Sequence, residues 1–222
     1  MGKDKLRKFA ENETFKCLVQ PTSEEMLSGS HPLRGNWNRE IFHNDNPIVL
    51  ELGCGKGEYT IALAERNPGI NYIGVDIKGA RLWKGAKYAT LNNLPNVAFL
   101  RTRIDFIKSI FAEDEVSEIW ITFADPQPKR ANKRLTSPVF LDRYRAFLKK
   151  DGIINVKTDS QLLHEYTVEV AESQNLEIIE KNNDIYGSGR ATEGDVLSIK
   201  TFYEQGFLAQ GLPITYVAFR LR

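Results

Sequence analysis

Short apolar runs alternate with longer, mixed segments along most of the chain. The apolar runs predict strands at 48–52, 71–76, 97–101, 117–123, 152–157, 176–183 and 214–221. The segments between them predict helices at 57–67, 79–93, 105–111, 137–149 and 160–174, with one more near 197–206 in a loop at 184–213. This alternation is typical of an α/β fold, in which a mostly parallel, seven-stranded sheet carries helices on both faces.

The first 46 residues differ from the rest of the chain. They lack a clean period and contain Pro21, Gly29, Pro32 and Gly35, which interrupt helices and strands. We therefore expect residues 1–46 to form an irregular N-terminal arm that could contain a short helix, and residues 47–222 to form one domain. The start of this arm is basic, with Lys3, Lys5, Arg7 and Lys8.

Several predicted strands end in an acidic residue. In a parallel sheet, ligands bind beyond the carboxyl ends of the strands, so these acids are candidates for a binding site. They are Glu51, Asp76, Asp105, Asp125 and Asp159.

Three glycines at alternate positions follow the first predicted strand. Gly53, Gly55 and Gly57 stand between this strand and a helix, where they allow a sharp turn and let a ligand approach the main chain. Glu51 precedes them, and Asp76 ends the next strand, where an acid typically accepts hydrogen bonds from ribose hydroxyls. Together these five residues predict a nucleoside-binding half-domain.

The spacing of the glycines distinguishes between cofactors. A dinucleotide site needs G-x-G-x-x-G, but Glu58 stands where the third glycine is required and would repel a pyrophosphate. The Gly-Lys-Ser/Thr of a P-loop is also missing. The pattern E-x-G-x-G-x-G resembles motif I of the S-adenosylmethionine-dependent methyltransferases, whose cofactor has no phosphates and carries cationic groups that suit an acid.

A second motif, Phe123-Ala124-Asp125-Pro126-Gln127-Pro128-Lys129, follows the strand at 117–123. Its two prolines predict a stiff turn that fixes Asp125 toward the cofactor, although such a turn also serves simply to end a strand. From Lys129 to Lys150 there are eight basic residues and one acid. Cations at the catalytic edge would meet phosphates, whereas the alternative is a solvated charge run. The basic candidates on the loop are Lys129, Arg130, Lys133 and Arg134.

Asp105 opens the predicted short helix at 105–111. Its functional interpretation is a hydrogen bond from the exocyclic amine of adenine. The structural alternative is a helix N-cap, a position that aspartate favours.

Composition narrows the class of protein without identifying a partner. Thirty basic and twenty-nine acidic residues give a net charge of +1, so only the distribution of charge bears on nucleic-acid binding. The two cysteines are far apart and the three histidines are scattered, so we expect no disulfide and no metal site, as in a cytoplasmic protein. We expect neither a signal peptide nor a membrane span.

The ordered motifs from Ile48 to Arg222 resemble those of the bacterial tRNA (guanine-N7-)-methyltransferases. The markers are E-x-G-x-G-x-G, F-x-D-P-x-P-K with its basic loop, K-T-D at a strand end, and a late T-x-Y-E. The resemblance implies a Rossmann-like class I methyltransferase fold, S-adenosylmethionine as cofactor and a guanine in the variable loop of tRNA as substrate.

The resemblance also implies roles for individual residues. Asp125 would be catalytic and would contact the cofactor together with Glu51, Asp76 and Asp105. Glu204 would recognise guanine, because a carboxylate can accept hydrogen bonds from both N1–H and the N2 amino group. The implied substrate contacts are Lys129, Asp159, Thr201, Phe202, Tyr203 and Glu204.

The chain departs from the family pattern in four respects. Ala124 replaces the usual proline, Gln127 replaces the usual tryptophan, and Asp76 replaces the commoner glutamate. The basic loop is about two residues shorter and lacks its usual histidine. These changes affect the expected tRNA contacts and leave the cofactor site intact.

Other functions share part of this evidence. A methyltransferase acting on another RNA, a small molecule or a protein would need the same cofactor residues. An RNA-binding protein that had lost catalysis would not need the acids Glu51, Asp76 and Asp125. An amino-methylating enzyme usually has Asp/Asn-Pro-Pro-Tyr, which Gln127 and Pro128 do not match. The oligomeric state stays open between monomer and homodimer, and no obligatory protein partner is evident.

Overall fold

The computed structural model describes residues 3–29 and 31–222, apart from the side chain of Lys3. Its strands form a single sheet in the order β1-β4-β3-β2-β5-β6-β8-β7. Their bounds are β1 Leu18–Val19, β2 Ile48–Leu52, β3 Asn71–Asp76, β4 Val97–Arg101, β5 Val116–Thr122, β6 Leu148–Thr158, β7 Ile178–Asn182 and β8 Thr215–Arg220.

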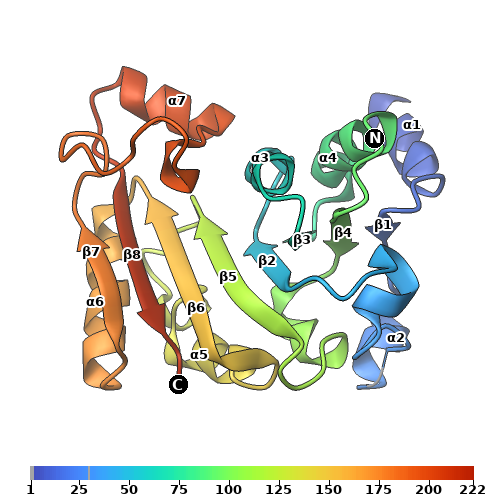
Figure 1. Cartoon of the computed structure of the whole chain (residues 1–222), viewed down its shortest axis with the longest axis horizontal. Helices are drawn as coiled ribbons and strands as arrows, with labels where there is room; N and C mark the ends of the chain where they lie inside the picture. The colour runs from blue at the N-terminus through green and yellow to red at the C-terminus, as the bar shows by residue number, and fades with distance from the viewer. Residues whose placement is uncertain (1–2, 30) are drawn as a thin grey trace.

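All neighbouring strands run parallel except where β8 pairs with β6 and β7. The predicted Rossmann-like fold is therefore confirmed. The sheet has eight strands rather than the expected seven, because β1 adds an edge strand beside β4. In Figure 1 the arrowheads of β2, β5 and β6 point to one edge of the sheet, and α3 and α7 lie at that edge.

The helices connect the strands largely as the sequence pattern predicts. The α-helices are α1 Lys3–Asn12, α2 Ser23–Leu27, α3 Glu58–Arg66, α4 Gly79–Leu91, α5 Pro138–Tyr144, α6 Gln161–Ser173 and α7 Phe202–Ala209. Shorter turns of 3₁₀ helix are η2 Ile104–Ser109, η3 Ala131–Lys133 and η4 Val196–Ser198, and η1 Asn38–Phe42 is a π-helix.

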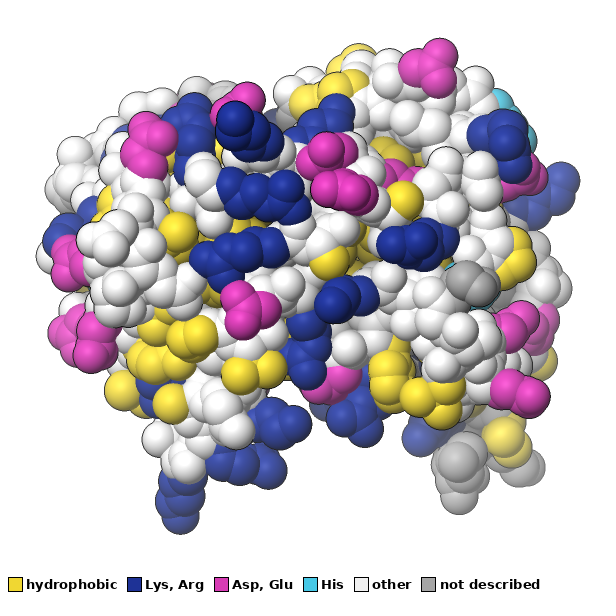
Figure 2. Space-filling model, turned by 90° about the horizontal axis from the view of Figure 1, so that it is seen from below, with side chains coloured by type: hydrophobic (Ala, Val, Ile, Leu, Met, Phe, Trp, Pro, Cys, Tyr) yellow, Lys and Arg dark blue, Asp and Glu magenta, His cyan; other side chains and the backbone are white. Residues whose placement is uncertain are grey.

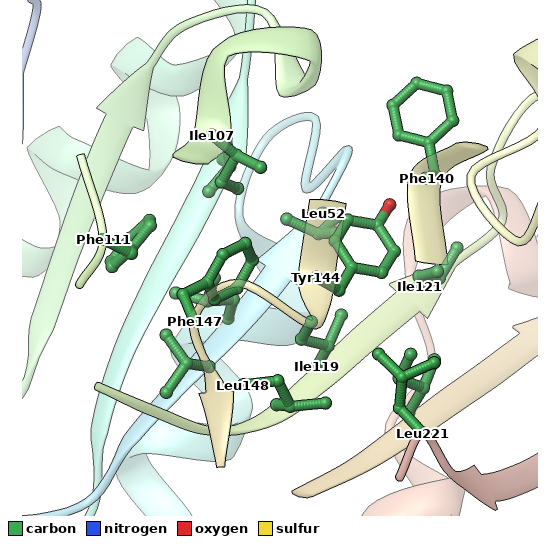
Figure 3. Close-up of a cluster of buried hydrophobic side chains, with 14 of the residues drawn as sticks. Leu52, Ile107, Phe111, Ile119, Ile121, Phe140, Tyr144, Phe147, Leu148 and Leu221 are labelled. Atoms are coloured by element: carbon green, nitrogen blue, oxygen red, sulfur yellow. The ribbon is translucent and has the colours of Figure 1, made fainter. Parts of the chain in front are cut away.

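The sheet separates two apolar cores. Successive side chains of a strand point to opposite faces, so Leu50 and Leu52 of β2 enter one core and Val49 enters the other. The first core, shown in Figure 3, includes aromatic side chains such as Phe140, Tyr144 and Phe147 around the strands. By the same alternation Glu51 lies on the face covered by α3, which positions it beneath the glycine turn.

The N-terminal segment is not the irregular arm that the sequence suggested. It contains α1, β1, α2 and η1, and it contributes large side chains to both cores. Trp37 is completely buried, donates from Nε1 to the Ile110 carbonyl at 3.0 Å, and stacks on Phe111. Prolines and glycines separate these short elements, but burial of apolar side chains determines their conformation.

Two predicted helices have the wrong extent. The helix expected at 137–149 ends at Tyr144, and β6 begins at Leu148 instead of 152. Phe147 and Leu148 are buried in the core, and Leu148 pairs with Val116 of β5, so tertiary packing overrides the helical pattern there. The helix expected near 197–206 is divided into η4 and α7, because Thr201 caps a new helix.

Candidate active site

The glycine turn between β2 and α3 has the conformation that its sequence predicts. Gly53, Gly55 and Gly57 have φ values of +81°, +59° and +74°, which strain residues with a Cβ. A Cβ added to Gly53 or Gly55 would meet no described atom within 4 Å, so their backbone faces open space. Main-chain atoms of these two residues are therefore accessible to a ligand.

Gly57 serves packing rather than an open binding surface. A Cβ at this position would lie 2.5 Å from the Phe99 ring, which is buried beneath the turn. Gly57 is also the N-cap of α3, and its N–H donates to the Cys54 carbonyl at 2.8 Å. The structure thus gives Gly57 a packing role, and its contact with the cofactor stays a prediction.

We expect Gly57→Ala and Gly53→Ala to have different effects. Gly57→Ala should destabilise the fold by about 2–4 kcal/mol, because backbone strain adds to a clash with Phe99. Gly53→Ala should cost about 1–2 kcal/mol of strain and mainly weaken cofactor binding. Urea unfolding and calorimetric titration with S-adenosylmethionine would separate the two effects. Equal destabilisation by both variants would contradict this assignment.

Asp76 joins the glycine turn to the next loop. Its Oδ2 accepts from the Gly55 N–H at 3.1 Å, and its Oδ1 accepts from the Lys78 N–H at 2.7 Å. The carboxylate also lines a pocket of about 420 Å³ beyond the carboxyl ends of β2 to β5. Asp76 can therefore hold the turn and present acceptor lone pairs to a ligand.

This pocket brings together three of the predicted acids. Asp76, Asp105 and Asp125 line it, along with Gly53 and Phe123. Its lining also includes the basic side chains of Lys78, Arg81, Arg103 and Lys133. Its volume suits a nucleoside, and its three carboxylates can accept hydrogen bonds from the donors of such a ligand. These acids are far apart in the chain, and they meet because ligands bind beyond the carboxyl ends of parallel strands, where all three were predicted to lie.

Glu51 lies at an adjoining smaller pocket of about 80 Å³, which shares Gly53 and Phe123 with the larger one. It is only 3% exposed. Its carboxylate accepts hydrogen bonds from the Thr60 N–H at 2.8 Å and from the hydroxyls of Thr60 and Thr122. Burial raises the pKa of Glu51 to about 7, while these hydrogen bonds oppose the rise. A cationic ligand would favour its ionised form.

Asp105 is half-buried in the wall of the larger pocket. It forms ion pairs with Arg103 at 3.1 Å and with Arg143 at 3.7 Å. The N-cap of η2 is Arg103, so Asp105 does not have the capping role considered as its alternative. The two arginines orient the carboxylate at the pocket wall.

The turn that carries Asp125 is held in a strained conformation. Phe123 and Gln127, on either side of it, have φ values of +50° and +45°, which are rare for residues other than glycine. Asp125 Oδ1 accepts from the Gln127 N–H at 2.9 Å, which leaves Oδ2 for other interactions. The carboxylate is exposed and lines the larger pocket. Such strain is common at functional sites.

The basic loop divides into exposed and buried residues. Lys129, Arg130 and Lys133 are exposed, and Lys133 also lines the larger pocket. Arg134 is only 5% exposed, donates from Nε to the Pro126 carbonyl at 2.9 Å, and lies 4.3 Å over the Tyr166 ring. Its predicted contact with substrate phosphates does not fit this position, because the guanidinium supports the turn of Asp125 instead.

In the later part of the basic run, Arg143 reaches the pocket through its ion pair with Asp105, but the other basic residues are remote from it. Arg145 pairs with Asp142 at 2.6 Å, and Lys149 and Lys150 lie near the start of β6, at the opposite end of the sheet. Figure 2, which views this opposite end, shows many lysine and arginine side chains with acidic ones among them. Basic residues are therefore not concentrated at the pocket alone.

The basic start of the N-terminal segment is largely paired. Arg7 lies 2.8 Å from Asp4 and 3.2 Å from Glu11, and Lys8 lies 2.8 Å from Asp4. Lys5 is exposed, and the Lys3 side chain lies outside the described residues. Helix α1 packs against α4 and leaves a small surplus of positive charge there.

The late motif at 201–204 reaches the smaller pocket. Thr201 and Tyr203 line it, while Phe202 is exposed and its ring lies 4.5 Å from Lys56 Nζ. Glu204 is completely buried in a capping box with Thr201. In this arrangement a guanine cannot reach Glu204, so a direct contact would require the first turn of α7 to move.

Asp159 lies just beyond β6 and is partly buried. It belongs to neither of the two pockets described above, as far as the described chain defines their walls. Burial raises its pKa. Its predicted contact with substrate stays a prediction.

Sequence reasoning missed two residues that the pockets include. Arg81 of α4 lines both pockets, and Thr122 at the end of β5 hydrogen-bonds Glu51. Thr122 could have been identified from its position at a strand end. Arg81 carries no such signal, because it lies within α4 and not at the end of a strand.

Comparisons with known proteins agree with the geometry of this site. A family model described as "Putative methyltransferase" matches residues 45–216. A protein of Christiangramia forsetii named tRNA (guanine-N(7)-)-methyltransferase is 51% identical over 100% of this chain and 99% of its own length. A protein of the same name from Bacteroides thetaiotaomicron is 49% identical over 100% of this chain and 87% of its own length.

Solved structures with the same fold are more distant in sequence. The 16S rRNA methyltransferase KamB superposes with a TM-score of 0.63 at 13% identity, over 81% of this chain and 90% of its own. A geranyl diphosphate C-methyltransferase from Streptomyces coelicolor, solved with S-adenosyl-L-homocysteine, gives a TM-score of 0.51 at 16% identity, over 80% of this chain and 74% of its own. These likenesses show that the fold is that of methyltransferases.

Two further findings concern the described residues. None of their helices has the length and apolar character needed to cross a membrane. Within 3–29 and 31–222, no three His, Cys, Asp or Glu side chains are grouped as metal ligands would be.

Proposed function

This chain belongs to the tRNA (guanine-N(7)-)-methyltransferase family, and from that premise we propose that it methylates N7 of a guanine in the variable loop of tRNA. The methyl donor is S-adenosylmethionine. The observation that carries the proposal is the meeting of the glycine turn, Asp76, Asp105 and Asp125 at one pocket, with exposed cations of the 129–133 loop beside it.

The residues of the site fit this donor. Asp76 offers acceptors for the ribose hydroxyls, and Asp105 offers one for the adenine amine. Glu51 and the open backbone at Gly53 and Gly55 suit the cationic amino-acid part. When bound, S-adenosylmethionine supplies an electrophilic methyl group, and the protein supplies the alignment.

Methylation at N7 needs no strong base. The N7 atom carries no proton, so its lone pair is already nucleophilic, and the main task is alignment, which contributes up to about 7–11 kcal/mol. Positive charge develops on the purine as the bond forms. Asp125, fixed by its strained turn, would stabilise that charge. The target base must leave its stack to enter the site, which costs a few kcal/mol.

We propose that the exposed cations of the loop bind the phosphates of the tRNA backbone. They are Lys129, Arg130 and Lys133. Each phosphate contact releases counterions, so binding weakens as salt increases. Arg134 is buried against Pro126 and Tyr166, and we assign it to the support of the Asp125 turn.

The triple variant Lys129→Gln/Arg130→Gln/Lys133→Gln should weaken tRNA binding and reduce its salt dependence. The slope of log K against log salt should fall by about 2–3, because each lost contact contributes ~0.7–0.9. Filter binding between 50 and 200 mM salt measures this slope. The double variant Lys149→Gln/Lys150→Gln is the matched control, because these lysines lie at the opposite end of the sheet. Equal slopes for the triple variant and the wild type would exclude the loop as a phosphate site.

The proposed activity is tested by incubating the protein with labelled S-adenosylmethionine and one of four acceptors. Unmodified tRNA should accept label, whereas ribosomal RNA, total protein and small-molecule extracts should not. Transfer to another RNA or to a small molecule would favour the alternative methyltransferase functions. Binding of tRNA without any transfer would favour an RNA-binding protein that has lost catalysis.

We further propose that residues 47–222 carry catalysis, with residues 1–46 packed around them as part of the same fold. We propose that the enzyme acts in the cytoplasm, where its tRNA substrate is found. We also propose that it acts as a monomer or a homodimer, without an obligatory protein partner.

A further inference from the structure

A buried lysine beneath the active site has no part in the chemistry above. Lys157 lies near the carboxyl end of β6, and its side chain is 0% exposed. Its Nζ donates to the Leu197 carbonyl at 2.8 Å and to the Ile199 carbonyl at 2.8 Å, and it lies 2.7 Å from Glu204 Oε1. The three donors of the ammonium group thus match three acceptors.

Glu204 connects this lysine to the start of α7. It too is 0% exposed, and Tyr186 donates to its Oε1 at 2.7 Å. Its Oε2 accepts from the Thr201 N–H at 3.3 Å, while Thr201 Oγ1 accepts from the Glu204 N–H at 3.3 Å. The ion pair therefore fixes the first turn of α7, which carries Thr201 and Tyr203 to the smaller pocket.

The main chain of the same lysine holds the catalytic turn. The Phe123 N–H donates to the Lys157 carbonyl at 2.9 Å, at the residue whose φ is +50°. Asp125 follows two positions later. Figure 1 shows α7 above the carboxyl ends of β5 and β6, which lie side by side. Lys157 thus connects the two elements that border the site.

Stability alone does not explain such an ion pair. Removing two charges from water is costly, and apolar residues of similar size often stabilise a fold equally well or better. A buried ion pair does, however, impose a direction on the groups that it joins. Here the ion pair fixes the first turn of α7 relative to β6, and it therefore determines the shape of the smaller pocket.

We propose that Lys157 is a positioning residue whose ion pair with Glu204 holds the first turn of α7 against the Asp125 turn, so that Thr201 and Tyr203 close the smaller pocket over the amino-acid part of the cofactor and meet the target base at its rim. This assignment rests on the proposed function. It gives Glu204 an internal role in place of direct guanine contact.

The test uses variants with and without an unpaired buried charge. Lys157→Met leaves Glu204 buried without its cation and is expected to destabilise the protein, so the double variant Lys157→Met/Glu204→Gln removes both charges and keeps a side-chain oxygen that can accept from the Thr201 N–H in the capping box. The double variant should keep its fold by circular dichroism and its affinity for S-adenosylmethionine within about threefold. Its kcat for tRNA should fall at least 100-fold, with KM for tRNA nearly unchanged, because the 129–133 loop still binds the backbone. Arg220→Met, which breaks a surface ion pair with Glu177, is the control and should match the wild type.

Hydrogen exchange provides a readout that does not depend on activity. In the double variant, amides 201–205 should exchange faster than in the wild type, while amides of β3 and β4 should not change. A folded double variant with wild-type kcat, or with unchanged exchange at 201–205, would overturn the role of Lys157. A wild-type protein that fails to methylate tRNA would overturn the proposed function instead, and the exchange data would still decide whether the ion pair holds α7.

Discussion

Replacing Asp125 with asparagine is expected to lower kcat about 100- to 1,000-fold, the range found when one preorganised charge-stabilising group is removed. The variant removes the negative charge near the purine. It keeps an oxygen that can accept from the Gln127 N–H, so the turn should retain its shape. Single-turnover methyl transfer at saturating tRNA and cofactor measures the loss directly.

The control for Asp125→Asn is cofactor affinity. Asp125 lines the cofactor pocket, so a modest weakening is expected, and saturation removes its effect on kcat. Asp105→Asn, in the lining of the same pocket, is the matched variant and should affect affinity more than kcat. If Asp125→Asn retained full kcat with unchanged cofactor binding, the catalytic role of Asp125 would be wrong.

Glu51 is expected to make cofactor binding depend on pH. Burial raises its pKa to about 7, so below this pH the free enzyme holds a neutral carboxyl group that attracts the cationic cofactor less strongly. Affinity should rise about tenfold between pH 6 and pH 8, because one pKa unit corresponds to one decade of protonation. Calorimetric titration across this range tests the prediction.

Glu51→Gln provides the reference for that titration, since any pH dependence that remains belongs to the cofactor. Its affinity at pH 8 should be roughly 10- to 100-fold weaker, because a hydrogen bond to a charged group is lost.

The raised pKa of Glu51 also affects the stability of the fold. A raised pKa means that ionisation disfavours the folded state, so the Glu51 contribution to stability falls as pH rises from about 4.5 to about 7. The variant should therefore gain stability relative to the wild type over this interval. If cofactor affinity and the free energy of unfolding changed with pH in the same way in both proteins, the pH dependence could not be assigned to Glu51.

The sequence predicted those parts of the site that depend on local chemistry. The glycine turn requires positive φ at alternate residues, and the structure has it at Gly53, Gly55 and Gly57. The acids at the ends of β3 and β5 meet because parallel strands end at one edge of the sheet. Both rules connect a short motif directly to a position in space.

The sequence could not predict which charged residues are buried. Arginine and lysine are usually found at the surface, but Arg134 and Lys157 are buried. Their burial depends on partners distant in the chain, such as the Leu197 carbonyl, which is 40 positions from Lys157. The same limit applies to β1, which has only two residues and exists because it pairs with β4. Long-range pairing, not local pattern, determines these features.

The central claim is most directly tested by mapping the methyl group. Unmodified tRNA transcripts with the variable-loop guanine intact, or replaced by adenine, are incubated with labelled S-adenosylmethionine and then cleaved chemically at N7-methylguanine. We predict label only in the guanine transcript, with cleavage at that single nucleotide. Equal labelling of both transcripts, or label that gives no cleavage at that guanine, would contradict the proposed function.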